Sequence, residues 1–122
     1  MGVDLVPVER MERLLREQPA IRDRVFTGAE QRYCEGRRRA SQHYAARFAA
    51  KEAVLKAFGT GLASGMEWTD IEIVHARSGR PTVQLAGVLA DHARARGLVD
   101  LDLSLSHTTG LAMAHAVARF TT

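Results

Sequence analysis

The 122-residue chain is predicted to be a single α+β domain in which a largely antiparallel sheet packs against a long central helix. Three observations support this prediction. A run of good helix formers covers about residues 40–58 and ends at Gly59, a residue type that tolerates the left-handed backbone at a helix end. After Gly65 the apolar residues alternate with a period of two, as in strands. The length allows one hydrophobic core, so residues 1–122 are expected to form one domain.

Local sequence signals predict the individual elements. In chain order we expect a strand at 2–6, helices at 7–18, 28–34 and 40–58, strands at 71–73 and 83–85, a helix at 88–97, and strands at 101–106 and 111–118. Thr27 and Glu30 have the spacing of a capping box, which predicts the start of the second helix. Residues 78–81, Ser-Gly-Arg-Pro, predict the turn of a hairpin. Aspartate is disfavoured in strands, so Asp4 is expected to end the first strand or to have a function.

Composition and charge narrow the classes of function. The apolar content of 46% and charged content of 25% fit a globular domain. With one cysteine, Cys34, and no apolar run or leader of the membrane-targeting kind, we expect a cytoplasmic protein without a membrane partner. The net charge of +3 is uneven, because residues 36–57 hold six basic side chains and one acid. This segment favours a polyanionic ligand: a nucleic acid, a phosphorylated small molecule or an acidic protein.

The central helix carries the first candidate site. Glu52 and Lys56 lie one turn apart on a stripe between apolar patches, so packing neighbours should partly enclose them. Buried charge is costly unless it is paired or bound to a ligand. The simpler interpretation is a helical ion pair that contributes only a few tenths of a kcal/mol, roughly 0.2–0.5. Arg47 and Lys51 form a second stripe further round the helix.

Three features could converge on one site: Asp4, the pair Glu52 and Lys56, and His107 in a strand-to-strand turn. Two carboxylates without a thiolate favour Mg²⁺, with phosphate oxygens completing its coordination. A lysine one turn from the carboxylate would neutralise a phosphate oxygen. The segment Gly59-Thr60-Gly61 permits close approach of a ligand, but the Gly-Lys-Ser/Thr of a nucleotide-hydrolysing loop is absent. Taken singly, each feature is more commonly a turn, a cap or a solvated charge.

Several short motifs, taken together and in this order, resemble those of holo-acyl-carrier-protein synthase, the small single-domain type of 4′-phosphopantetheinyl transferase. They are Gly2-Val3-Asp4, Glu9-Arg10, Phe26-Thr27 with Glu30, residues 47–53, Lys56-Ala57-Phe58-Gly59-Thr60-Gly61, Gly79-Arg80-Pro81 and Leu103-Ser104-Leu105-Ser106-His107. The resemblance covers nearly the whole chain. It implies the fold of that family and Mg²⁺-dependent transfer of 4′-phosphopantetheine from coenzyme A to a serine of an acyl carrier protein. The other product would be adenosine 3′,5′-bisphosphate.

The resemblance also implies roles for individual residues. Asp4 and Glu52 would hold Mg²⁺, and with Lys56, which contacts the pyrophosphate, they would form the catalytic set. The residues expected at coenzyme A are Arg38, Arg39, Arg47, Lys56, Gly59, Thr60, Gly61, Pro81, His107 and Thr108. The residues expected at the carrier protein are Arg10, Arg13, Arg22 and Arg24. Members of the family form homotrimers with shared sites, so Arg38, Arg39 and Arg47 would serve a neighbouring subunit.

Some points stay open at this level. The base for the serine is Glu52, directly or through a water on the metal. Family members have a few residues before the Gly-x-Asp motif, so the first strand is expected to be short here, either by truncation or because the chain was excised from a longer synthase. Two other functions are considered: a non-catalytic module that binds coenzyme A or a carrier protein, and a small basic RNA-binding domain. The sequence does not distinguish fatty-acid from polyketide carriers, or coenzyme A from acyl-coenzyme A.

Overall fold

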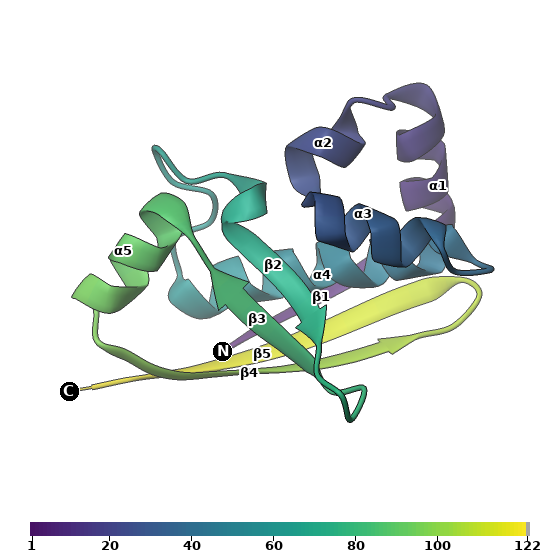
Figure 1. The fold of residues 1–122 in the computed structure, drawn as a ribbon. Helices are drawn as coiled ribbons and strands as arrows, with labels where there is room; N and C mark the ends of the chain where they lie inside the picture. Colours follow the sequence, from purple (N-terminus) through teal and green to yellow (C-terminus); the bar gives the residue numbers. More distant parts are fainter. Residues whose placement is uncertain (122) are drawn as a thin grey trace.

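The computed structural model describes residues 1–121 and confirms the α+β class (Figure 1). In chain order its elements are β1 (Gly2–Pro7), α1 (Val8–Glu17), α2 (Ile21–Val25), α3 (Gly28–Glu35), α4 (Ala40–Phe58), the 3₁₀ turn η1 (Trp68–Asp70), β2 (Ile71–His75), β3 (Pro81–Leu85), α5 (Gly87–Ala95), β4 (Leu98–His107) and β5 (Leu111–Phe120). Within the described chain no helix combines the length and apolar character needed to cross a bilayer.

The strands form two antiparallel sheets where one was expected. β1, β5 and β4 make a three-stranded sheet in the order β1-β5-β4, and β2 pairs with β3 as the predicted hairpin. β3 lies near β4, but a cavity of about 370 Å³ lined by residues of both strands separates them. Across that gap the Arg80 guanidinium donates a 3.0 Å hydrogen bond to Asp102. Side chains therefore connect the two sheets where a continuous sheet would use backbone hydrogen bonds.

The long helix α4 packs on β1 and β5 through small side chains. On α4 these are the buried Ala45, Ala46, Ala49, Ala50 and Ala53, and on β5 they are Ala112, Ala114 and Ala116. Gly2 extends this close packing to β1, because a Cβ there would overlap the Ala53 carbonyl oxygen. Figure 1 shows α4 between the three-stranded sheet and the helices α1 to α3. Side chains of β1 that point to α4 therefore lie close to the helix surface.

The start of α3 and the end of α4 form as their local sequence signals predict, but one helix was not predicted. The capping box is present, since Thr27 Oγ1 accepts from Glu30 N at 3.2 Å and Glu30 Oε1 accepts from Thr27 N at 2.9 Å. α4 ends at Gly59, which has φ +76°, as predicted. Helix α2 was not predicted, because five residues are too few to display a helical period.

A buried ion pair ties α3 to α4. Lys51 Nζ lies 2.7 Å from Glu30 Oε1, and neither side chain is exposed. The ammonium also donates to the carbonyls of Val25 and Trp68, and Glu30 Oε2 accepts from Ile73 N at 2.8 Å. Every charge is therefore satisfied, as buried charges require. Since Lys51 is buried and paired, the surplus positive charge of residues 36–57 is smaller at the surface than the sequence indicated.

Candidate active site

The structure brings Asp4, Glu52 and Lys56 together. Lys56 Nζ donates to Asp4 Oδ1 at 2.9 Å and to the Val3 carbonyl at 3.1 Å. Asp4 lies in the middle of β1, opposite Ala114, so of the two expectations for this residue the strand end is wrong and a function remains. The period of the strand explains its position: Gly2, Asp4 and Val6 share the face that packs on α4. This aspartate is therefore tolerated in a strand because it points at charged side chains of the helix.

Glu52 is partly enclosed beside Asp4. Burial raises the pKa of Glu52, the negative charge of Asp4 raises it further, and the charges of Lys56 and Arg10 oppose the shift. The predicted enclosure of Glu52 is thus confirmed, whereas Lys56 is exposed. Arg10, expected at the carrier protein, lies near enough to Glu52 to act on its charge.

Asp4 and Glu52 suit a Mg²⁺ site that is completed by water and phosphate oxygens, rather than a metal site made of protein ligands alone. Among residues 1–121 no group of three or more His, Cys, Asp or Glu side chains is placed to hold a metal. Mg²⁺ typically takes only one or two carboxylates and fills its other positions with water and phosphate oxygens. After burial, the negative charge of Asp4 is the second cause that raises the pKa of Glu52, and a divalent cation bound by both carboxylates would offset that repulsion.

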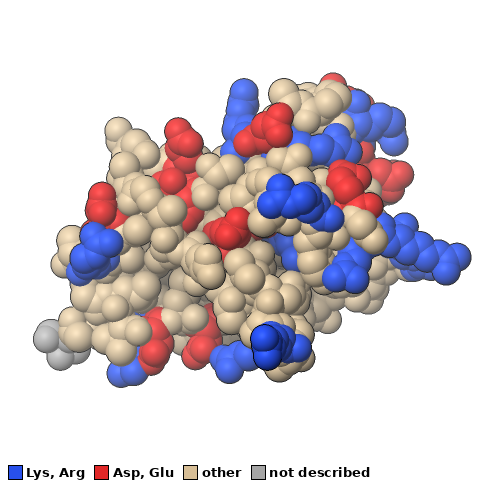
Figure 2. Space-filling model, viewed as in Figure 1, with Lys and Arg blue, Asp and Glu red and all other residues tan. Residues whose placement is uncertain are grey.

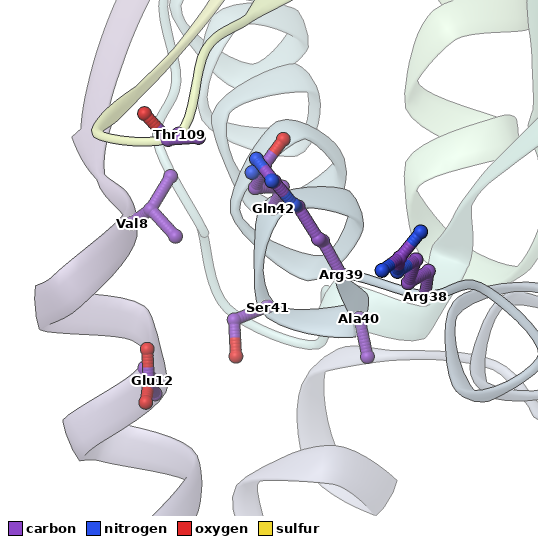
Figure 3. A pocket seen from close by; sticks show the side chains of 8 residues that line it. All are labelled: Val8, Glu12, Arg38, Arg39, Ala40, Ser41, Gln42 and Thr109. Atoms are coloured by element: carbon purple, nitrogen blue, oxygen red, sulfur yellow. The ribbon is translucent and has the colours of Figure 1, made fainter.

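Arg38 and Arg39 border a separate cavity at the start of α4. The cavity has a volume of about 410 Å³ and is lined by Val8, Glu12, Arg38, Arg39, Ala40, Ser41, Gln42 and Thr109. Figure 3 shows Val8 and Glu12 lining it from α1, and Arg39 reaching toward Gln42 on α4. Both arginines are exposed. Neither forms an ion pair with another residue of the described part of the chain, so both are available to an anionic ligand.

A third cavity holds Arg47, Pro81 and His107, all expected at coenzyme A. Its volume is about 180 Å³, and its lining is Tyr33, His43, Ala46, Arg47, His75, Gly79, Pro81, Leu105 and His107. His107 is the last residue of β4, and its Nδ1 lies 3.0 Å from Gln42 Oε1. The structure therefore places His107 with Arg47 in one cavity, whose lining does not include Asp4, Glu52 or Lys56. His43 and His75 were missed, because their elements meet only in the folded chain.

The other predicted residues fall into two groups. Gly59, Thr60 and Gly61 follow the last turn of α4, where Thr60 Oγ1 donates to the Gly61 carbonyl. Thr108 Oγ1 accepts from the backbone of Gly110 and Leu111, so this side chain is engaged in the β4–β5 turn.

The four arginines expected at a carrier protein lie on the first two helices. Arg10 and Arg13 on α1 and Arg24 on α2 are exposed. Arg22 is half-buried and donates to Glu35 Oε2 and the Leu15 carbonyl. Figure 2 shows Lys and Arg side chains on the side of the molecule that carries α1 to α3, with Asp and Glu among them. Within residues 1–121, Arg10, Arg13 and Arg24 therefore make no such contacts.

Comparison with known proteins agrees with this geometry. The family model described as the 4′-phosphopantetheinyl transferase superfamily matches residues 1–113. A holo-[acyl-carrier-protein] synthase of Geobacter sp. (strain M21) is 44% identical over 117 residues, covering 95% of this chain and 94% of that protein. A protein of the same name from Moorella thermoacetica is 44% identical over 116 residues, covering 95% and 90%.

Solved structures of holo-[acyl-carrier-protein] synthases have a similar fold at lower sequence identity. The synthase from Neisseria meningitidis superposes with a TM-score of 0.89 at 30% identity, covering 97% of this chain and 95% of that one. The complex of the synthase of Chronobacterium ammoniagenes with coenzyme A has a TM-score of 0.87 at 32% identity, covering 99% and 96%. With its long central helix, its carboxylate pair and these similarities over nearly its full length, the chain belongs to the holo-acyl-carrier-protein synthase family of 4′-phosphopantetheinyl transferases.

Proposed function

We infer that the protein transfers 4′-phosphopantetheine from coenzyme A to a serine hydroxyl of an apo acyl carrier protein, and that it requires Mg²⁺. The observation that carries this inference is the meeting of Asp4, Glu52 and Lys56 in a chain of this family. Coenzyme A as the donor is supported by the relatives whose solved structures contain it.

Three side chains account for the chemistry. The serine oxygen attacks the phosphorus that bears the pantetheine arm, and the bond from that phosphorus to the bridging oxygen of the pyrophosphate breaks. The serine proton passes to a Glu52 carboxylate oxygen, which acts as the general base. Lys56 stabilises the negative charge that develops on the departing adenosine 3′,5′-bisphosphate. Asp4 orients Lys56, and Mg²⁺ held by Asp4 and Glu52 would supply further positive charge at the pyrophosphate.

The active site is proposed to be shared between subunits of a homotrimer. Arg47 and Lys56 are nine residues apart on α4, which puts them about half a turn apart around the helix and about 13 Å apart along its axis. One coenzyme A molecule would have to wrap around α4 to reach both within one chain. Strands β1 and β5 also expose an apolar face that neighbouring subunits could bury in such an assembly. Its residues, each 43% to 54% exposed, are Val3, Leu5, Leu111, Met113 and Val117.

The carrier protein is proposed to be acidic and to dock on the first two helices. The exposed Arg10, Arg13 and Arg24 would supply the complementary charge. We propose a cytoplasmic setting, which agrees with the single, buried and unpaired Cys34. An RNA-binding role is less well supported, because two basic residues of the 36–57 segment, Arg47 and Lys51, are buried.

The direct test is mass spectrometry of an apo carrier protein incubated with the enzyme, coenzyme A and Mg²⁺. We expect the carrier to gain the mass of one phosphopantetheine, and no gain with any of several apo carriers would refute the proposed activity. Omission of Mg²⁺ with added chelator should abolish the gain. A chain that binds coenzyme A tightly but never modifies a carrier would be the non-catalytic module.

A mixing experiment tests the shared site. Lys56→Ala and Arg39→Ala are each expected to be inactive as pure proteins. If each site takes Lys56 from one subunit and Arg39 from the next, randomly mixed trimers regain activity at about a quarter of their sites. Mixtures that stay as inactive as the pure variants would contradict the shared site.

A further inference from the structure

The end of α4 is held by a side chain from the end of α5. Arg96 directly follows α5, and its Nη1 donates a 2.5 Å hydrogen bond to the carbonyl of Phe58, the last residue of α4. The two residues are 38 positions apart in the chain, and Figure 1 shows α5 beside this end of α4. The contact fixes the point at which the helix ends and the segment Gly59-Thr60-Gly61 begins.

An aromatic ring keeps the Arg96 guanidinium in place. Its Cζ lies 4.3 Å from the centroid of the Phe120 ring at the end of β5, and that ring lies 5.8 Å from the ring of Phe58. A guanidinium over an aromatic face is attracted to it. A cation near the C-terminus of a helix also interacts favourably with the carbonyls there. Although Arg96 is an exposed residue, its guanidinium therefore joins α5 to the ends of both α4 and β5.

The last turn of α4 needs this contact because a helix cannot satisfy its final carbonyls by itself. The backbone N–H of Gly59 donates to the carbonyls of Leu55 and Lys56, each at 3.0 Å, and the carbonyl of Phe58 is served by the side chain from α5. Beyond the helix the packing is loose, since a Cβ at Gly59 or Gly61 would meet no atom of the described chain within 4 Å. The guanidinium is therefore well placed to decide whether this turn stays formed or frays.

The same turn carries Lys56, two residues before the end of the helix. Its ammonium donates to Asp4 Oδ1 at 2.9 Å and to the Val3 carbonyl at 3.1 Å, and the side chain is half-exposed. Fraying of the turn would move the backbone from which this side chain starts and so pull the ammonium away from β1. A misplacement of about 1 Å at a catalytic group can cost about 100-fold in rate. The position of Lys56 therefore depends on how firmly the end of α4 is held.

We propose that Arg96 is a positioning residue for the transfer reaction. It fixes the last turn of α4 and, through that turn, the place at which Lys56 meets the pyrophosphate of coenzyme A, without touching the substrate itself. The inference rests on the proposed function and adds to it a residue that lies outside the motifs on which the family resemblance depends.

The test measures the dissociation constant of coenzyme A by calorimetry in the presence of Mg²⁺. Arg96→Ala is made in the wild-type protein and in a Lys56→Ala background, because a residue that acts through Lys56 matters only where the lysine is present. Arg96→Lys tests for rescue by a second cation. Arg94→Ala is the matched control, since it removes an exposed arginine of the same helix that pairs with Asp91. Melting temperatures establish that every variant is folded at the temperature of the measurement.

We expect Arg96→Ala to weaken binding about tenfold in the wild-type protein, as loss of one charged hydrogen bond would, and less than about twofold in the Lys56→Ala background. Arg96→Lys should stay within about threefold of wild type, because its ammonium can still donate to the Phe58 carbonyl. Arg94→Ala should bind as wild type does. An equal loss in both backgrounds, or no loss in either, would overturn the inference and leave the transferase proposal intact. Failure of wild type to bind coenzyme A and to modify any carrier would refute both.

Discussion

Replacing Lys51 with methionine should destabilise the protein far more than an ordinary substitution of lysine. The change leaves the Glu30 carboxylate buried with only the backbone donors of Thr27 and Ile73, and it leaves the carbonyls of Val25 and Trp68 without their ammonium donor. Removing one member of a buried ion pair costs about 3–5 kcal/mol. That is a large part of a total stability of about 5–15 kcal/mol.

Chemical denaturation with urea, monitored by circular dichroism, measures this loss. Lys56→Met is the matched control, because it makes the same change on the same helix at an exposed ion pair and should shift the midpoint much less. Glu30→Gln and the double variant complete a double-mutant cycle, in which the double variant should be more stable than the sum of the single losses predicts. A loss below about 1 kcal/mol for Lys51→Met, or no coupling in the cycle, would refute the reasoning.

Three further outcomes are expected. Glu52→Gln should reduce turnover at least about 100-fold, and without Mg²⁺ it should raise the melting temperature near pH 7. The melting temperature rises because the pKa of Glu52 is higher in the folded than in the unfolded protein. Glu52 stabilises the fold fully below its unfolded-state pKa, and this contribution is lost as the pH rises through its folded-state pKa. At neutral pH the charged carboxylate therefore lowers stability, and glutamine removes that charge. A lower melting temperature would contradict this. In wild type without Mg²⁺, the Glu52 carboxyl should titrate above the usual glutamate value of 4.5 when followed by NMR, and a pKa at or below that value would contradict its enclosure beside Asp4. Met113→Glu should give a monomeric mass by sedimentation and lose activity, whereas an unchanged trimer would exclude the apolar sheet face as the interface.

Local patterns predicted the framework because the corresponding interactions are local. The capping box joins residues three apart, and Gly59 ends α4 through its own backbone conformation. The β2–β3 hairpin follows from alternation on both sides of a short turn. In each case the contacts that form the element lie within the few residues that predicted it.

The misses concern contacts between distant parts of the chain. The sequence put Arg47 and Lys51 on one stripe, but nothing within the helix indicates that α3 and β2 cover it. Asp4 was expected to end its strand or to have a function, and the strand end was wrong because no strand rule allows for a lysine from a helix 52 positions away. The cavity of about 180 Å³ beside Arg47 is the extreme case: its His43, His75 and His107 come from three elements, and only their packing brings them together.

The alanines between α4 and β5 have a practical consequence. Alanine is conventionally used as the neutral replacement, and alanine scanning changes every residue except those that are already alanine. Here the buried alanines of both elements allow the helix to approach the strands that carry Asp4. Enlarging Ala53 or Ala114 would push α4 outward and so alter the spacing of Asp4 and Glu52. A conventional scan would skip these positions, so a search for residues that tune turnover should add methylene groups there instead of removing them.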